Sequence, residues 1–173
     1  MTKQDQDSFN DDLLAFLDAS PTPFHAVLSM TKMLGNAGFS ELSEADEWVL
    51  KAGDKHFVTR NGSSIIAFVV GHDDLGNNGI RLVGAHTDSP CLMVKPQPDI
   101  SKQGYSQLGV EVYGGALLNP WFDRDLSIAG RVVYRNSKNQ LKQKLVDFKT
   151  AVATIPSLAI HLDRNANTDH SIN

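Results

Sequence analysis

The chain has 173 residues, a formal net charge of −4 and 41% hydrophobic residues, which suits one or two small globular units with a real core. Its slightly acidic balance excludes a basic stripe for nucleic acid, and no apolar run approaches the roughly 20 residues of a membrane span. The single cysteine, Cys91, and a polar, acidic start unlike a secretory signal together predict a cytoplasmic protein.

Two amphipathic helices are predicted near the start of the chain. Residues 8–19 carry apolar side chains at the i, i+4, i+7 and i+8 spacing of one helix face, namely Phe9, Leu13, Phe16 and Leu17. Thr22 followed by Pro23 is typical of an N-cap and a first helical position. This second helix is expected to end near Gly38.

Strands are predicted after the second helix. Residues 57–60 and 63–70 form a hairpin around an Asn-Gly dipeptide, which tolerates the positive φ that tight hairpins need. Residues 80–85 are almost continuously apolar, which predicts a short central strand. Further strands are expected over residues 108–113, 129–135 and 140–148. The pattern changes from α/β to β-rich near Pro96, where we place a domain boundary.

The segment RLVGAHTDSP, residues 81–90, carries the most informative polar side chains. Its apolar run leads to His86 and then Asp88, which project to the same side of an extended chain. Ligands of open α/β sheets bind where strands end, and a metal-ligating imidazole needs an acceptor, commonly a carboxylate, for its second ring nitrogen. The pair therefore suits a metal ligand with its orienting carboxylate. The alternative is a strand-end histidine followed by a turn at Asp88 and Ser89.

Five stretches resemble the M18 metallopeptidases, the aspartyl aminopeptidases. LVGAHTDSPCLMVKP (82–96) is similar to the family's first metal-ligand segment. VEVYGGALLNPWFDRDLSIAGRV (110–132) and IPSLAIHLDRN (155–165) are similar to two later blocks. LLAFLDASPTPFHAV (13–27) and FVTRNGSSIIAF (57–68) also match, so the resemblance runs in the family's order from about residue 9 to the end.

This resemblance implies a fold and an activity. It implies a zinc-exopeptidase-like α/β catalytic domain, whose N-terminal part is residues 1–95. It also implies an inserted β-rich dimerisation domain, whose first part is residues 96–173 and which is expected to stop in mid-domain. The implied protein is a cytoplasmic zinc metalloprotease with a two-metal site. As an aminopeptidase, this hydrolase would remove N-terminal Asp or Glu from peptides. Its implied assembly is a homo-oligomer built from dimers, up to a dodecamer.

The resemblance also assigns roles to individual residues. His86 would be a metal ligand, and Asp88 would act in catalysis as the carboxylate that orients it. His161 would be a second metal ligand, or would instead reach across a subunit contact toward a neighbour's substrate. The structural interpretation of His161 is a half-buried histidine in a strand over residues 158–162.

The resemblance implies that the remaining ligands are a bridging Asp, an adjacent Glu pair and a late His, and it places them, as an expectation, after residue 173. Zinc sites take three or four protein ligands, so the chain alone is expected to be inactive. A non-catalytic oligomerisation fragment, or a truncated relative without a complete metal site, is therefore the main alternative. A second alternative is an aminopeptidase of the same chemistry that prefers neutral substrates. A hydrolase pair of Cys91 with His86 is disfavoured, because such a pair needs a third orienting group.

The stretch WFDRDL supports two interpretations. Asp123 and Asp125 flank Arg124, which suits metal ligation or recognition of a substrate carboxylate. The favoured interpretation is an ion-paired turn anchored by Trp121 and Phe122, since Arg–Asp clusters are commonly structural.

Overall fold

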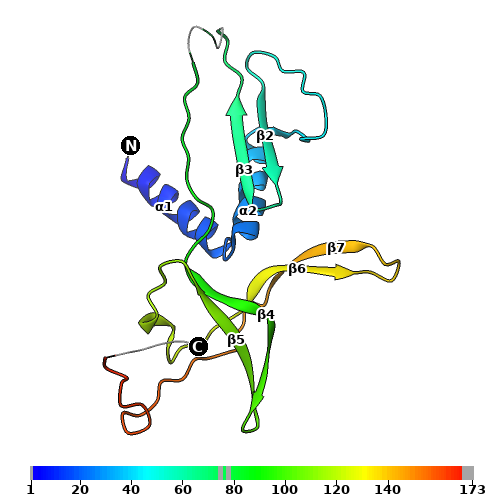
Figure 1. Ribbon diagram of the computed structural model, residues 1–173. Coiled ribbons are helices and arrows are strands. Elements are labelled where there is room, and N and C mark those ends of the chain that lie inside the picture. Colours follow the sequence, from blue (N-terminus) through cyan, green and yellow to red (C-terminus); the bar gives the residue numbers. More distant parts are fainter. Residues whose placement is uncertain (1, 74–75, 77–78, 169–173) are drawn as a thin grey trace. The chain divides into compact units, whose positions relative to one another are not determined.

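The computed structural model describes residues 2–73, 76 and 79–168 and contains both helices and strands (Figure 1). The chain forms two compact units. The first comprises Met1–Asp88 and Ala129–Val146, and the second comprises Ser89–Ile128 and Asp147–Asn173. The α/β class expected from the sequence is confirmed. The assignment of residues 1–95 and 96–173 to a catalytic and an inserted domain stays a prediction.

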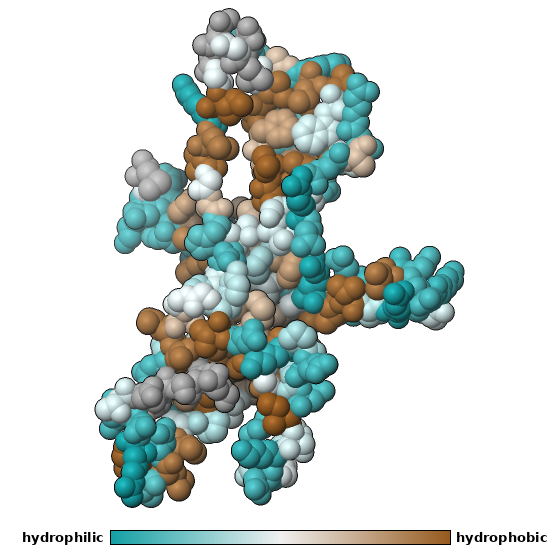
Figure 2. All heavy atoms as spheres, in the orientation of Figure 1, coloured by the Kyte–Doolittle hydropathy of each residue, from teal (hydrophilic) through white to brown (hydrophobic). Residues whose placement is uncertain are grey.

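The first unit begins with helix α1, Lys3–Asp18. It starts before the predicted residue 8 because Thr2 and Asp5 form a capping box: the Asp5 backbone N–H donates to the Thr2 hydroxyl, and the Thr2 N–H donates to the Asp5 carboxylate. The apolar stripe of α1 is largely exposed, with Phe16 half-buried. Large apolar side chains are also exposed elsewhere on the molecule (Figure 2).

Helix α2, Pro23–Asn36, confirms the second predicted helix and both of its end signals. Thr22 is the N-cap, and its hydroxyl accepts a hydrogen bond from the His25 backbone N–H. The helix ends in a Schellman motif, in which the Phe39 N–H donates to the Leu34 carbonyl at 3.0 Å. Gly38 has φ +83°, a left-handed conformation that glycine adopts without steric cost.

A three-stranded sheet follows, in the order β1-β2-β3. Its strands are Ser40–Glu41, Lys55–Arg60 and Ser64–Val69. β2 and β3 pair antiparallel up to Arg60 opposite Ser64, and the intervening Asn61 and Gly62 have φ of 54° and 63°. The predicted hairpin is therefore confirmed. The core of the described residues lies where α2 meets β2, at Ala26, Val27, Phe57 and Val58.

The strand predicted over residues 80–85 is wrong. Residues 79–90 belong to no helix or strand, and Leu82 and Val83 are 85% and 96% exposed. A central strand needs a hydrogen-bonded neighbour on each side, and within the described residues the sheet of β1, β2 and β3 does not extend to this segment. Apolar composition therefore indicated a tendency to be buried, but composition alone supplies no pairing partner.

The first unit also contains most of a second hairpin. β6, Ala129–Arg135, has the predicted bounds, and β7, Leu141–Asp147, lies within the predicted residues 140–148. The turn between them includes Asn139 with φ 59°. β6 contacts α2, which brings this hairpin against the first unit's helix.

The second unit contains the antiparallel pair β4, Cys91–Lys102, and β5, Tyr105–Tyr113. β5 includes the predicted strand 108–113, whereas no strand was predicted over β4, which contains Pro96 and Pro98. They lie where the β4–β5 register shifts, between Val94 and Asp99, so they interrupt the ladder at a bulge that tolerates proline.

The rest of the second unit is a short 3-10 helix, Asn119–Trp121, and irregular chain that forms bridges from Phe122 to Ile155 and from Leu126 to Ala153. No helix in the part of the chain that the structure describes has the length and apolar character needed to cross a membrane.

Candidate metal-ligand segment

The structure brings His86 and Asp88 together. His86 Nδ1 lies 2.8 Å from the Asp88 backbone carbonyl oxygen and 3.1 Å from its carboxylate oxygen Oδ1. Both oxygens are acceptors, so the Nδ1–H donates to them and the neutral ring carries its proton on Nδ1. The other nitrogen, Nε2, then presents a lone pair, and the side chain is 81% exposed.

This arrangement fits one ligand of a zinc site. Zinc binds the unprotonated nitrogen of a neutral imidazole, and such ligands usually donate their other N–H to a carboxylate or carbonyl. Asp88 supplies both kinds of acceptor. Among the described residues, however, no group of three or more His, Cys, Asp or Glu side chains is placed to hold a metal. His86 and Asp88 therefore fit as a ligand and its orienting partner, and not as a complete site.

A third residue of the segment connects it to the sheet. The Thr87 hydroxyl donates a 2.8 Å hydrogen bond to the backbone carbonyl of Ser63, next to the β2–β3 turn. Thr87 is half-buried, in contrast with the exposed residues 79–86 before it. This contact lies within the first unit.

His161 belongs to the second unit, whereas His86 belongs to the first. The structural alternative for His161, a half-buried position in a strand over residues 158–162, does not match the structure. His161 is exposed in a turn, where the N–H groups of Leu162 and Asp163 donate to the Ala159 carbonyl. Its role as a metal ligand or as a substrate contact stays a prediction.

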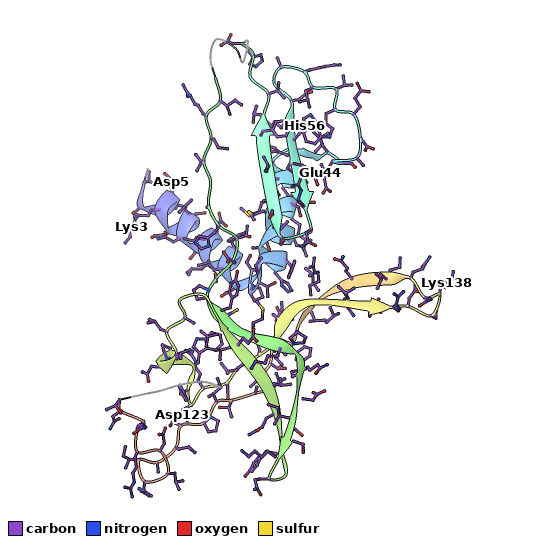
Figure 3. All side chains as sticks on the ribbon, in the orientation of Figure 1. Lys3, Asp5, Glu44, His56, Asp123 and Lys138 are labelled. Carbon is purple, nitrogen blue, oxygen red and sulfur yellow. The ribbon has the colours of Figure 1, made fainter. Side chains whose placement is uncertain are left out.

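Asp123, labelled in Figure 3, belongs to the WFDRDL stretch. Its carboxylate has a well-defined partner in Ser157. The Ser157 backbone N–H donates to Asp123 Oδ1 at 2.8 Å, and the Ser157 hydroxyl donates to the other carboxylate oxygen. Both bonds lower the pKa of the Asp123 carboxyl from its ordinary value of 3.8, and the bond from the hydroxyl has the larger effect. Arg124 donates to the Pro120 carbonyl. The structure thus supports a structural turn, held by serine in place of the expected ion pair.

Arg131 makes a contact that no sequence motif indicates. Its Nη1 donates to the backbone and side-chain oxygens of Asn61, at 2.7 and 2.9 Å, and its guanidinium lies 4.0 Å from the centre of the Phe24 ring. Asn61 and Arg131 are 70 positions apart, so no local periodicity or motif could indicate this contact.

Comparison with known proteins identifies the family. The sequence model of Peptidase_M18, described as aminopeptidase I zinc metalloprotease (M18), matches residues 16–173. The chain therefore belongs to the M18 family of zinc metallopeptidases.

Relatives extend this result to particular proteins. A probable M18 family aminopeptidase 2 from Pseudomonas putida KT2440 is 58% identical over 168 residues, which are 97% of this chain and 39% of that protein. The corresponding protein of Ectopseudomonas mendocina ymp is 59% identical, over 93% of this chain and 37% of its own length. The chain thus spans about two-fifths of the length of the curated relatives that it matches.

Solved structures agree with this assignment. A chain in the cryo-EM structure of the Ape4 and Nbr1 complex matches 94% of this chain, with a TM-score of 0.85 and 46% identity, over 31% of its own length. Chaetomium thermophilum mApe1 has a TM-score of 0.82 and 44% identity, over 90% of this chain and 36% of its own. The S. cerevisiae mApe1 dodecamer has a TM-score of 0.82 and 32% identity, over 91% and 37%.

Proposed function

We propose that this chain supplies the zinc ligand His86 to an aminopeptidase that removes N-terminal Asp or Glu from peptides. The observation that carries the proposal is the pair of Asp88 oxygens that face His86 Nδ1 and leave the lone pair of Nε2 available to bind a metal ion. The description of the family as zinc metalloproteases supports zinc as the metal.

When bound, zinc would polarise the scissile carbonyl and activate water for attack. The role of the chain's own residues is to orient the metal ligand. Asp88 fixes the tautomer and orientation of the His86 ring, and its charge raises the basicity of the ligand. A two-metal site, completed by ligands outside the His86 and Asp88 pair, is part of the proposal.

His161 is the second proposed contributor. Of its two predicted roles, we favour contact with a substrate bound by a neighbouring subunit over direct metal ligation, because its exposed turn leaves the ring accessible. This role requires the proposed homo-oligomer of dimers. The likeness to S. cerevisiae mApe1, which was solved as a dodecamer, supports that assembly. A cytoplasmic location, consistent with the single cysteine, completes the proposal.

The test is a chimera in which this chain replaces the aligned segment of the Pseudomonas putida relative. We expect zinc-dependent hydrolysis that is faster for an Asp-linked than for a Leu-linked chromogenic substrate. His86→Ala should reduce the rate to background, whereas His72→Ala, which changes another exposed histidine of the first unit, should not.

Three results would contradict parts of this proposal. Full activity in the His86→Ala chimera would exclude His86 as a ligand. Preference for the Leu-linked substrate would replace the acidic specificity with a neutral one. A folded chimera that binds zinc and hydrolyses neither substrate would favour the non-catalytic alternative, to which the lack of a three-ligand cluster among the described residues also points.

A further inference from the structure

The segment that carries His86 has little of its own to hold it in place. Residues 79–90 belong to no strand, and the His86 side chain is 81% exposed, so neither a β-ladder nor packing fixes the ring. An exposed hydrogen bond such as that from Nδ1 to Asp88 competes with water and is weak by itself. The ring geometry therefore depends on how the backbone between His86 and Asp88 is held.

Thr87, the residue between them, provides that hold. Its hydroxyl donates to the Ser63 carbonyl at 2.8 Å from a half-buried position. The Ser63 carbonyl is held by local hydrogen bonding, because Ser63 follows the Asn61–Gly62 turn and its N–H donates to the Arg60 carbonyl. A displacement of this turn would move the Ser63 carbonyl and, with it, Thr87.

Arg131 holds the same turn through Asn61. It donates to both the backbone and the side-chain oxygen of Asn61, and its guanidinium stacks on Phe24 of α2. Phe24 lies in the same helical turn as Ala26 and Val27, which are buried in the core. The turn is thereby connected to the core through a cation–π contact and two hydrogen bonds, all within the first unit.

We infer that Thr87 and Arg131 are positioning residues that hold His86 in its Nδ1–H tautomer, with Nε2 directed outward for the metal. Arg131 holds the turn, the Ser63 carbonyl holds Thr87, and Thr87 holds the backbone that presents both Asp88 oxygens to Nδ1. The inference rests on the proposed function in taking His86 as the metal ligand. The tautomer itself is a property of the metal-free chain.

The test compares two matched pairs of variants. Thr87→Val keeps the side-chain shape and removes the donor, whereas Thr87→Ser keeps the hydroxyl. Arg131→Ala removes the contact with Asn61, whereas Arg135→Ala removes an arginine of the same strand that donates to Asn139 within its own hairpin turn. The first readout is the ring ¹⁵N chemical shifts of His86 in the metal-free 173-residue chain. The second is titration with zinc chloride of the chimera with the Pseudomonas putida relative that carries the same substitutions.

Thr87→Val and Arg131→Ala are expected to lower the Nδ1–H fraction of His86. They are also expected to raise the apparent zinc Kd at Nε2 by about tenfold, the lower end of effects seen for outer-shell partners of metal ligands. Thr87→Ser and Arg135→Ala should match the unsubstituted chain. Amide exchange at the buried Phe57 and Val58 shows whether each variant keeps its core.

The outcomes separate this inference from the proposed function. An unchanged tautomer in a folded Thr87→Val chain overturns the inference, whatever zinc does. If Arg131→Ala loses its core, the Thr87 pair alone decides. A tautomer that depends on Thr87, together with a zinc-binding chimera in which zinc leaves Nε2 unaffected, supports the positioning and overturns His86 as the ligand.

Discussion

At the scale of single residues, the proposed metal binding by His86 depends on which of its ring nitrogens carries the proton. Asp88 favours the proton on Nδ1, because its backbone carbonyl oxygen and its carboxylate oxygen both accept from that nitrogen. The two acceptors differ in distance and in charge. The backbone carbonyl is closer to Nδ1, at 2.8 Å, but only the carboxylate brings negative charge. Substitution of the side chain therefore separates charge from orientation.

Asp88→Asn should weaken zinc binding in the active chimera. We expect a loss of about 10-fold in zinc affinity, within the 10–100-fold range for such partners, because the backbone carbonyl continues to hold the tautomer. Competition with a chromogenic chelator measures it. Asp18→Asn, at the exposed end of α1, is the control. Unchanged affinity in Asp88→Asn would show that the charge of Asp88 does not act on the ligand.

A second prediction concerns the acid stability of the second unit. The hydrogen bonds from Ser157 lower the pKa of Asp123 in the folded state. A lowered folded pKa adds stability above the unfolded pKa, near 3.8, and that stability is lost as the pH falls through the folded pKa. Ser157→Ala should raise the pKa of Asp123 and flatten this part of the acid unfolding curve.

Carboxyl ¹³C titration of Asp123 measures this change directly. Asp125→Asn, in the same stretch, should leave the titration of Asp123 as it is. If Asp123 titrates alike with and without the Ser157 hydroxyl, then the serine does not stabilise the carboxylate.

At the scale of elements, the sequence predicted well those features that neighbouring residues determine. Thr22 and Pro23 marked the start of α2, and the Asn61–Gly62 turn marked the β2–β3 hairpin, because caps and tight turns follow from local backbone chemistry. The strand over residues 80–85 failed because pairing requires distant partners. The contact of Arg131 with Asn61 was not predictable for the same reason. Within the candidate site, His86 with Asp88 was accessible to sequence reasoning, whereas Thr87 and Arg131 were not.

The α2 cap gives a prediction at this scale. Thr22→Ala removes the acceptor for the His25 N–H and should lower the free energy of unfolding by about 1 kcal/mol. Thr31→Ala, in the interior of the same helix, removes a hydroxyl that donates to the Leu28 carbonyl and should be neutral or slightly stabilising. Urea denaturation compares the two. Equal effects would show that Thr22 does not act as a cap.

At the scale of the whole molecule, the chain is an M18 family member that contains the oriented imidazole of His86 and, among its described residues, no cluster of three metal ligands. Zinc sites need three or four protein ligands for tight binding. We therefore expect calorimetric titration of the chain with zinc to show weak binding. Tight binding at one zinc per chain would mean that the chain holds a complete site.

The most direct measurement is a crystal structure of the zinc-loaded chimera of this chain with the Pseudomonas putida relative. We expect a zinc ion about 2.0–2.1 Å from His86 Nε2, with Nδ1 still donating to Asp88. An ordered zinc ion at the catalytic centre with His86 outside its coordination sphere would contradict His86 as a zinc ligand.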